Sequence, residues 1–86
     1  MNAIETIINH YGKTAQTVKA MEELSELIVE LAKAFNGQGD VSHIAEEMAD
    51  VHVMLDQLQI IFNIDDRVLE VIATEKIRRT LHKIKQ

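Results

Sequence analysis

The chain has 86 residues and a formal net charge of -5, and 47% of its residues are hydrophobic. It contains no cysteine, which excludes disulfides, thiolate nucleophiles and cysteine-based zinc sites. The acidic balance argues against general binding of nucleic acid, because proteins that bind it usually present a basic surface to the phosphates.

The length and composition favour one all-α domain, residues 1–86. The chain has no proline and only three glycines, a composition that suits helices better than strands. A chain this short can bury only a modest core. We therefore expect an antiparallel helical hairpin core of about four helices, completed into a bundle by oligomerisation. No basic-then-apolar leader and no apolar run of roughly 20 residues is visible, so we expect a cytoplasmic location and no membrane partner.

The first two expected helices occupy the N-terminal part of the chain. Isoleucines spaced along one stripe predict a helix from Ala3 to Tyr11, which ends at Gly12. A longer helix should run from about Thr14 to Phe35. Its apolar face comprises Met21, Leu24, Ile28, Leu31, Ala32 and Phe35.

The clearest break in the chain, residues 36–40, precedes two more helices. Asp40 or Ser42 could cap a third helix that reaches about Phe62. Its core stripe comprises Ile44, Met48, Val51, Leu55, Leu58 and Phe62. Asp65 is a plausible N-cap for a fourth helix. The apolar residues of that helix are Leu69, Ile72, Ala73, Ile77, Leu81 and Ile84.

Two acidic clusters lie in the expected second and third helices. Glu23 and Glu26 are one helical turn apart, as are Glu47 and Asp50, so each pair projects from one side of its helix. If the two helices pack antiparallel, four carboxylates can meet. Their mutual repulsion is relieved most simply by a hard divalent cation with oxygen ligands, such as Mg²⁺.

The two clusters differ in how well a solvated surface explains them. Glu22, Glu26 and Glu30 lie opposite the apolar face of the second helix, so surface charge accounts for them. Glu47 and Asp50 instead lie along the flank of an apolar face, where carboxylates are rarely buried without a partner. The matched pair of clusters favours a metal site.

Basic residues gather in the last expected helix. Lys76 and Arg79 share one side of it and could reach an anion bound to the metal. Lys83 and Lys85 lie at its C-terminal end, where favourable interaction with the helix dipole explains them. The four histidines match no zinc or di-iron motif, so metal-assisted hydrolysis is the one enzymatic reaction that the sequence suggests.

These residues resemble a known family. The string Lys19-x-x-Glu22-Glu23-x-x-Glu26, followed by Glu46-Glu47-x-x-Asp50 and then Lys76-x-x-Arg79, is similar to the MazG-like nucleoside triphosphate pyrophosphohydrolases of the all-α NTP pyrophosphatase superfamily. The resemblance implies a homodimer or homotetramer that uses Mg²⁺, or Mn²⁺ in its place. It also implies hydrolysis of nucleoside triphosphates or dNTPs to the monophosphate and pyrophosphate by metal-activated water.

The resemblance also assigns roles to individual residues. The implied metal ligands are Glu23, Glu26, Glu47 and Asp50; the implied auxiliary catalytic carboxylates are Glu22 and Glu46; and the implied phosphate-binding residues are Lys19, Lys76 and Arg79. One position departs from the family pattern, because Thr74 stands where the family often has an asparagine before the basic pair.

Three alternatives stay open. The chain could be a non-enzymatic helical oligomerisation or interaction module whose acidic stripes form surface ion pairs. It could belong to the related phosphoribosyl-ATP pyrophosphatase branch, which shares a similar acidic layout. It could also bind nucleotides without cleaving them. Stabilisation by millimolar Mg²⁺ separates the first alternative from the enzyme.

Overall fold

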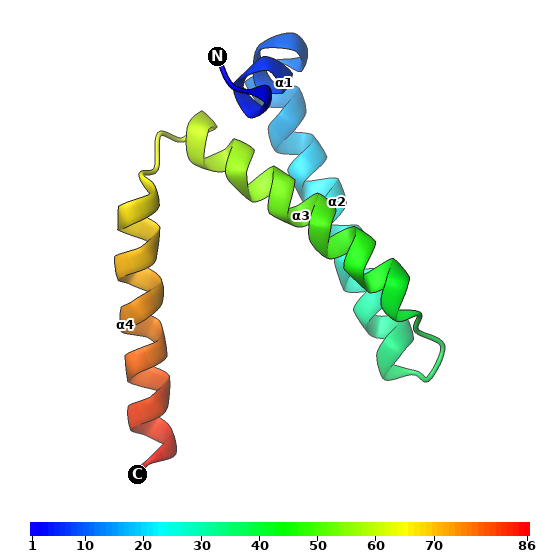
Figure 1. Cartoon of the computed structure of the whole chain (residues 1–86). Helices are drawn as coiled ribbons and strands as arrows, with labels where there is room; N and C mark the ends of the chain where they lie inside the picture. The colour runs from blue at the N-terminus through cyan, green and yellow to red at the C-terminus, as the bar shows by residue number, and fades with distance from the viewer.

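The computed structural model covers residues 1–86, and all of its regular secondary structure is α-helical (Figure 1). The four helices are α1 (Ala3–Tyr11), α2 (Lys13–Phe35), α3 (Val41–Ile61) and α4 (Asp66–Ile84). The all-α prediction and the four helices are therefore confirmed. None of these helices combines the length and the hydropathy that a membrane span requires.

The helix boundaries follow from local hydrogen bonds at their N-termini. The side chain of Asp40 accepts a 2.8 Å bond from the backbone N–H of Ser42, so Asp40 and not Ser42 caps α3. Asp65 caps α4 in the same way, as predicted, through the N–H of Arg67. Such side-chain acceptors satisfy backbone donors that the first helical turn leaves unpaired. Gly12, with φ of +94°, separates α1 from α2.

Helices α2 and α3 form an antiparallel hairpin, and α1 packs against both of them near the end opposite the connecting loop (Figure 1). Three pairs of residues face each other across the hairpin: Gln16 with Gln57, Glu23 with Asp50, and Glu26 with Glu47. Along α2 the three residues are separated by seven and then three positions. Their partners on α3 have the same separations in the reverse direction of the chain. This heptad-like register brings the two acidic clusters together.

The core of the single chain is very small. Its buried apolar residues are Ile8, Ala20, Val51 and Met54, and its buried polar residues are Gln16, Glu23 and Gln57. The predicted core face of the second helix is wrong for the single chain, since Met21, Leu24 and Ile28 are exposed. The side of α2 that meets α3 is instead the side that carries the three residues Gln16, Ala20 and Glu23.

The predicted core stripe of the third helix is only partly correct. Val51 is buried, and Ile44 and Leu58 are half-buried. Met48, Leu55 and Phe62 are exposed. Met54, which the predicted stripe omitted, is buried in their place because the contact with α2 is rotated around α3 from the expected line.

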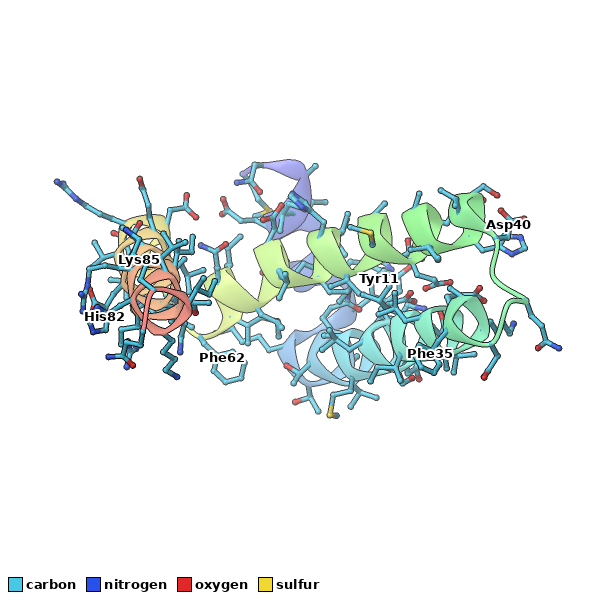
Figure 2. All side chains as sticks on the ribbon, turned by 90° about the horizontal axis from the view of Figure 1, so that it is seen from below. Tyr11, Phe35, Asp40, Phe62, His82 and Lys85 are labelled. Carbon is cyan, nitrogen blue, oxygen red and sulfur yellow. The ribbon has the colours of Figure 1, made fainter.

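Helix α4 extends away from the other three helices and buries none of its residues. Figure 2 looks along α4 and shows its side chains spread around the helix, with His82 on the side away from the hairpin. Its predicted core residues are thus exposed in the single chain. The radius of gyration is 16.0 Å, whereas a compact domain of this length would have about 12 Å.

Candidate metal centre

Three carboxylates from two helices converge on one point. Glu23 and Glu26 of α2 and Glu47 of α3 each present an oxygen within 4.8 Å of the others. Helical spacing places the first two on the same side of α2, and the hairpin register brings Glu47 opposite Glu26. The structure therefore brings together three of the four predicted metal ligands in one group.

Two oxygens of this cluster are buried without a partner. Only 6% of Glu23 is exposed, and its Oε2 atom, like Oε2 of Glu47, has no hydrogen-bond partner. Buried polar atoms are nearly always hydrogen-bonded, because desolvation without compensation is costly. Both oxygens therefore lack a partner in the single chain, and a bound cation would supply one.

Lys19 is the one cation beside the cluster. Its Nζ lies 3.1 Å from Oε1 of Glu23 and 4.0 Å from Oε2 of Glu22. The hydrogen bond from Lys19 lowers the pKa of Glu23, and the same bond raises the pKa of Lys19. One lysine therefore favours the ionised form of Glu23, but Glu26 and Glu47 form no ion pair with a basic residue.

Burial and mutual repulsion in the cluster mainly affect the carboxyl groups on α3, whose pKa values are raised. Desolvation first, and then the negative charges of Glu26 and Glu23, raise the pKa of Glu47. Asp50, the fourth predicted ligand, lies against Glu23, and desolvation followed by the charge of Glu23 raises its pKa. A set of carboxylate oxygens with excess negative charge fits a hard cation such as Mg²⁺, which prefers oxygen ligands.

The structure places the remaining predicted site residues at different distances from this centre. Glu22 and Glu46 are exposed at its edge, and the charge of Glu46 contributes to the raised pKa of Asp50. Lys76 and Arg79 lie on α4, away from the cluster, and Arg79 makes a 3.9 Å ion pair with Glu75 of its own helix. Within the single chain these two basic residues are not brought to the carboxylates.

The solvated-surface interpretation of the second helix holds for only part of it. Glu22 is exposed, as expected. Glu26 is also exposed, as expected, although one of its oxygens belongs to the cluster. The Glu30 side chain, only 15% exposed, pairs with Lys33 at 3.3 Å. The register of the hairpin, which no single helix reveals, accounts for the difference.

Sequence reasoning missed the buried amides Gln16 and Gln57. Gln16 precedes Glu23 by seven residues, and Gln57 follows Asp50 by seven. The sequence did contain a signal for them. In each helix a glutamine lies seven residues from an acidic residue, and this heptad spacing places both on the side that faces the other helix.

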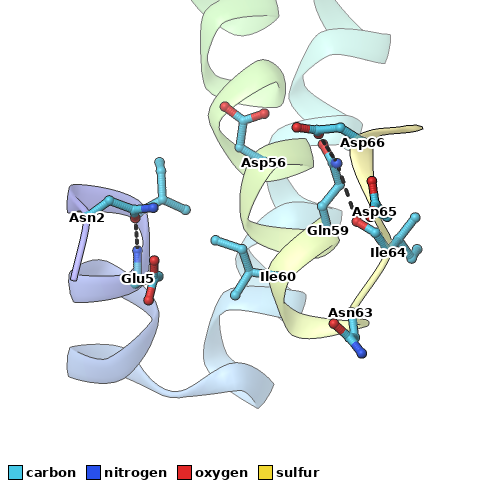
Figure 3. Close-up of a pocket in the computed structure, with 10 residues that line it drawn as sticks. Asn2, Glu5, Asp56, Gln59, Ile60, Asn63, Ile64, Asp65 and Asp66 are labelled. Atoms are coloured by element: carbon cyan, nitrogen blue, oxygen red, sulfur yellow. Dashed lines mark hydrogen bonds between the residues drawn. The ribbon is translucent and has the colours of Figure 1, made fainter. Parts of the chain in front are cut away.

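A second acidic hollow lies where α1, α3 and the start of α4 meet (Figure 3). It has a volume of about 870 Å³, and its carboxylates belong to Glu5, Asp56, Asp65 and Asp66. The amide of Gln59 donates to Asp66, and Asp65 caps α4, so two of these groups already have protein partners. None of its oxygens is buried without a partner, which favours the Glu23 cluster as the metal centre.

Comparison of the chain with protein-family models, with curated proteins and with solved structures finds no match.

Proposed function

We propose that this protein is a Mg²⁺-dependent hydrolase that converts nucleoside triphosphates or dNTPs to the monophosphate and pyrophosphate. The observation that carries the proposal is the pair of buried, unpartnered oxygens, Oε2 of Glu23 and Oε2 of Glu47, in one carboxylate cluster. The resemblance of the acidic and basic motifs to the MazG-like pyrophosphohydrolases supports the choice of reaction.

The proposed metal ligands are the carboxylates that face each other across the hairpin: Glu23, Glu26, Glu47 and Asp50. Mg²⁺, when bound there, would neutralise charge on the phosphate oxygens and so promote attack on phosphorus. Because both helices supply ligands, the register between α2 and α3 sets the spacing of the ligands, and the loop that connects the two helices supplies none.

The residues at the edge of the cluster have complementary tasks. Glu22 and Glu46, which are solvent-exposed, can orient a water molecule and accept its proton as its oxygen bonds to phosphorus. Lys19, half-exposed and adjacent to Glu23, can bind a phosphate oxygen. The water oxygen bonds to the α-phosphorus as the bond from that phosphorus to the oxygen that bridges the α and β phosphoryl groups breaks, and pyrophosphate leaves with the bridging oxygen.

We further propose that the active form is a homodimer or homotetramer. The single chain exposes 6857 Å², whereas a compact monomer of 9.8 kDa would expose about 5,200 Å². The excess, roughly 1,700 Å², exceeds the roughly 800 Å² that each partner contributes to a standard interface. A second copy can cover this surface.

Charge complementarity indicates where α4 of a second copy would dock. Its basic residues Lys76 and Arg79 have no acidic partner outside their own helix, and the hairpin carries uncompensated carboxylates. Packing of α4 from one copy against the hairpin of another would bring both basic side chains toward the phosphates. The predicted phosphate-binding role of these residues thus depends on assembly.

Product analysis tests the reaction that we propose. After incubation of each nucleoside triphosphate with the protein and Mg²⁺, the released phosphate species are separated and quantified. We expect equal amounts of pyrophosphate and monophosphate. Release of orthophosphate and the diphosphate, or no release from any nucleotide, would contradict the proposal.

A further inference from the structure

The buried amide pair of Gln16 and Gln57 is the main polar feature of the core that the proposed chemistry does not use. Gln16 is 7% exposed and Gln57 2% exposed, and Nε2 of Gln16 donates a 2.8 Å hydrogen bond to Oε1 of Gln57. The other side-chain bond of the pair runs from Gln57 to the sulfur of Met54 at 3.7 Å. Thioether sulfur is a weak acceptor.

The two amides therefore have donors and acceptors that form no hydrogen bond within the protein. A primary amide offers two donors and an acceptor with two lone pairs, and Oε1 of Gln16 accepts no hydrogen bond from the protein. Apolar side chains would fill the same space in so small a core without the desolvation cost of unpaired amide groups.

A hollow opens beside these amides. Its volume is about 520 Å³, within the usual range of small-molecule sites. Its lining includes Tyr11, Gln16, Val18, Lys19, Met54 and Gln57. Four of its eight lining residues are hydrophobic and four are polar or charged, and apolar surface combined with fixed polar groups is typical of small-molecule sites.

The hollow adjoins the metal centre. Lys19 and Glu22 line it, and Lys19 also contacts Glu23 at 3.1 Å. Gln16 lies two helical turns from Glu23, or about 10 Å along the axis of α2. A nucleotide whose phosphates lie at the carboxylates can reach the amides with its base.

We propose that this hollow receives the nucleobase and that Gln16 and Gln57 determine which base is accepted. This inference builds on the proposed function. Base edges present neighbouring donors and acceptors, which an amide can pair with in a bidentate manner. The bond between the two glutamines fixes the orientation of both amides, so the pattern that they offer is also fixed. Tyr11, 64% exposed at the rim, offers a ring on which the base stacks.

A binding experiment tests this assignment independently of cleavage. The affinities of four α,β-methylene nucleoside triphosphates, one for each base, are measured by calorimetry with Mg²⁺ for the wild type and for the Gln16→Met/Gln57→Met double variant. Replacing both partners of a buried hydrogen bond with apolar groups of similar shape is nearly neutral for stability, so the double variant should fold. We expect a preference of about tenfold or more for one base in the wild type, and its loss in the double variant.

Two further variants serve as a control for the substitution and as a test of base stacking. Gln38→Met makes the same chemical change at an exposed loop position and should keep the wild-type preference. Tyr11→Leu should lower affinity for all four analogues by a similar factor, because stacking depends little on the base.

The outcomes separate the two proposals. Equal affinities in the wild type, or an unchanged ranking in the double variant, would overturn the base-recognition proposal even if pyrophosphate is released. A ranking that the double variant loses, together with no cleavage of ordinary triphosphates, would support base recognition and overturn the hydrolase proposal.

Discussion

Glu23 on α2 and Asp50 on α3 face each other across the hairpin, and the pKa values of their carboxyl groups shift in opposite directions. The hydrogen bond from Lys19 lowers the pKa of Glu23. Desolvation and the resulting negative charge of Glu23 raise the pKa of Asp50. The cluster without metal is therefore charged on one helix and electrostatically strained on the other, and a divalent cation would relieve that strain.

The metal-free protein should lose stability as the pH rises toward neutral. The pKa values of Glu47 and Asp50 in the fold lie above their ordinary values of 4.5 and 3.8. The folded state therefore binds more protons than the unfolded state, and the free energy of unfolding falls as pH rises through the folded pKa values. Glu23 acts in the opposite sense, but its stabilisation is lost only below its ordinary value of 4.5. We expect Tm in EDTA to fall as the pH is raised from about 5 toward neutral.

The Glu47→Gln variant provides the control for this pH profile. It removes one of the two carboxylates whose pKa is raised and leaves the contacts of His43 with Asp40 and of His52 with Asp56 unchanged. Its decline in Tm over the same interval should be shallower than that of the wild type. Parallel profiles would show that the cluster does not cause the decline.

Mg²⁺ should raise the Tm of the wild type. At a metal concentration one hundred times Kd, binding linkage adds about 2.7 kcal/mol, which corresponds to an increase of about 10 °C or more for a domain of this size. Thermal unfolding followed by circular dichroism measures the shift. Glu47→Gln should reduce it strongly, whereas Glu70→Gln, an exposed position on α4, should not. A Tm that is indifferent to Mg²⁺ would favour the interaction-module alternative.

Lys19→Met should destabilise the metal-free protein more than Lys33→Met. Both lysines form an ion pair within α2, but Lys19 binds a Glu23 side chain that is 8% exposed, beside other carboxylates. Its removal leaves a buried charge without a counter-ion. The comparison is made by urea unfolding in EDTA. If both variants lose the same free energy of unfolding, the ion pair between Lys19 and Glu23 is worth no more than the one between Lys33 and Glu30.

A carboxylate placed on the apolar surface of α4 should disrupt assembly. Ile77 is 60% exposed in the single chain, and we expect a second copy to cover it. Sedimentation velocity should show an oligomer for the wild type and smaller species for Ile77→Glu. His82→Glu, which adds the same charge at a polar position of α4, is the matched control. A wild type that is monomeric throughout the accessible concentration range would contradict the proposed assembly.

The sequence predicted the helices well because their signals are local. Glycine at position 12 and the caps at Asp40 and Asp65 act within a few residues, so the pattern that defines them can be seen directly. The acidic spacings likewise indicated which carboxylates could meet, and Glu23, Glu26 and Glu47 do converge.

The faces of the helices could not be predicted in the same way. Helix α2 carries an apolar side with Met21 and Leu24 and another side with Gln16 and Glu23, and the second one meets α3. Hydrophobic periodicity identifies the side that avoids water, but it does not say whether the covering surface comes from the same chain or from another. The same reason explains the exposed apolar residues of α4.

Pyrophosphate release with and without Mg²⁺ tests the central claim most directly. The wild type, Glu47→Gln and Glu70→Gln are compared on a panel of ribo- and deoxyribonucleoside triphosphates, and folding of each variant is verified by circular dichroism. We predict release that requires Mg²⁺, that collapses in Glu47→Gln and that persists in Glu70→Gln. Absence of release from every nucleotide, or release that Glu47→Gln retains, would contradict the assignment of this cluster as the metal centre of a pyrophosphohydrolase.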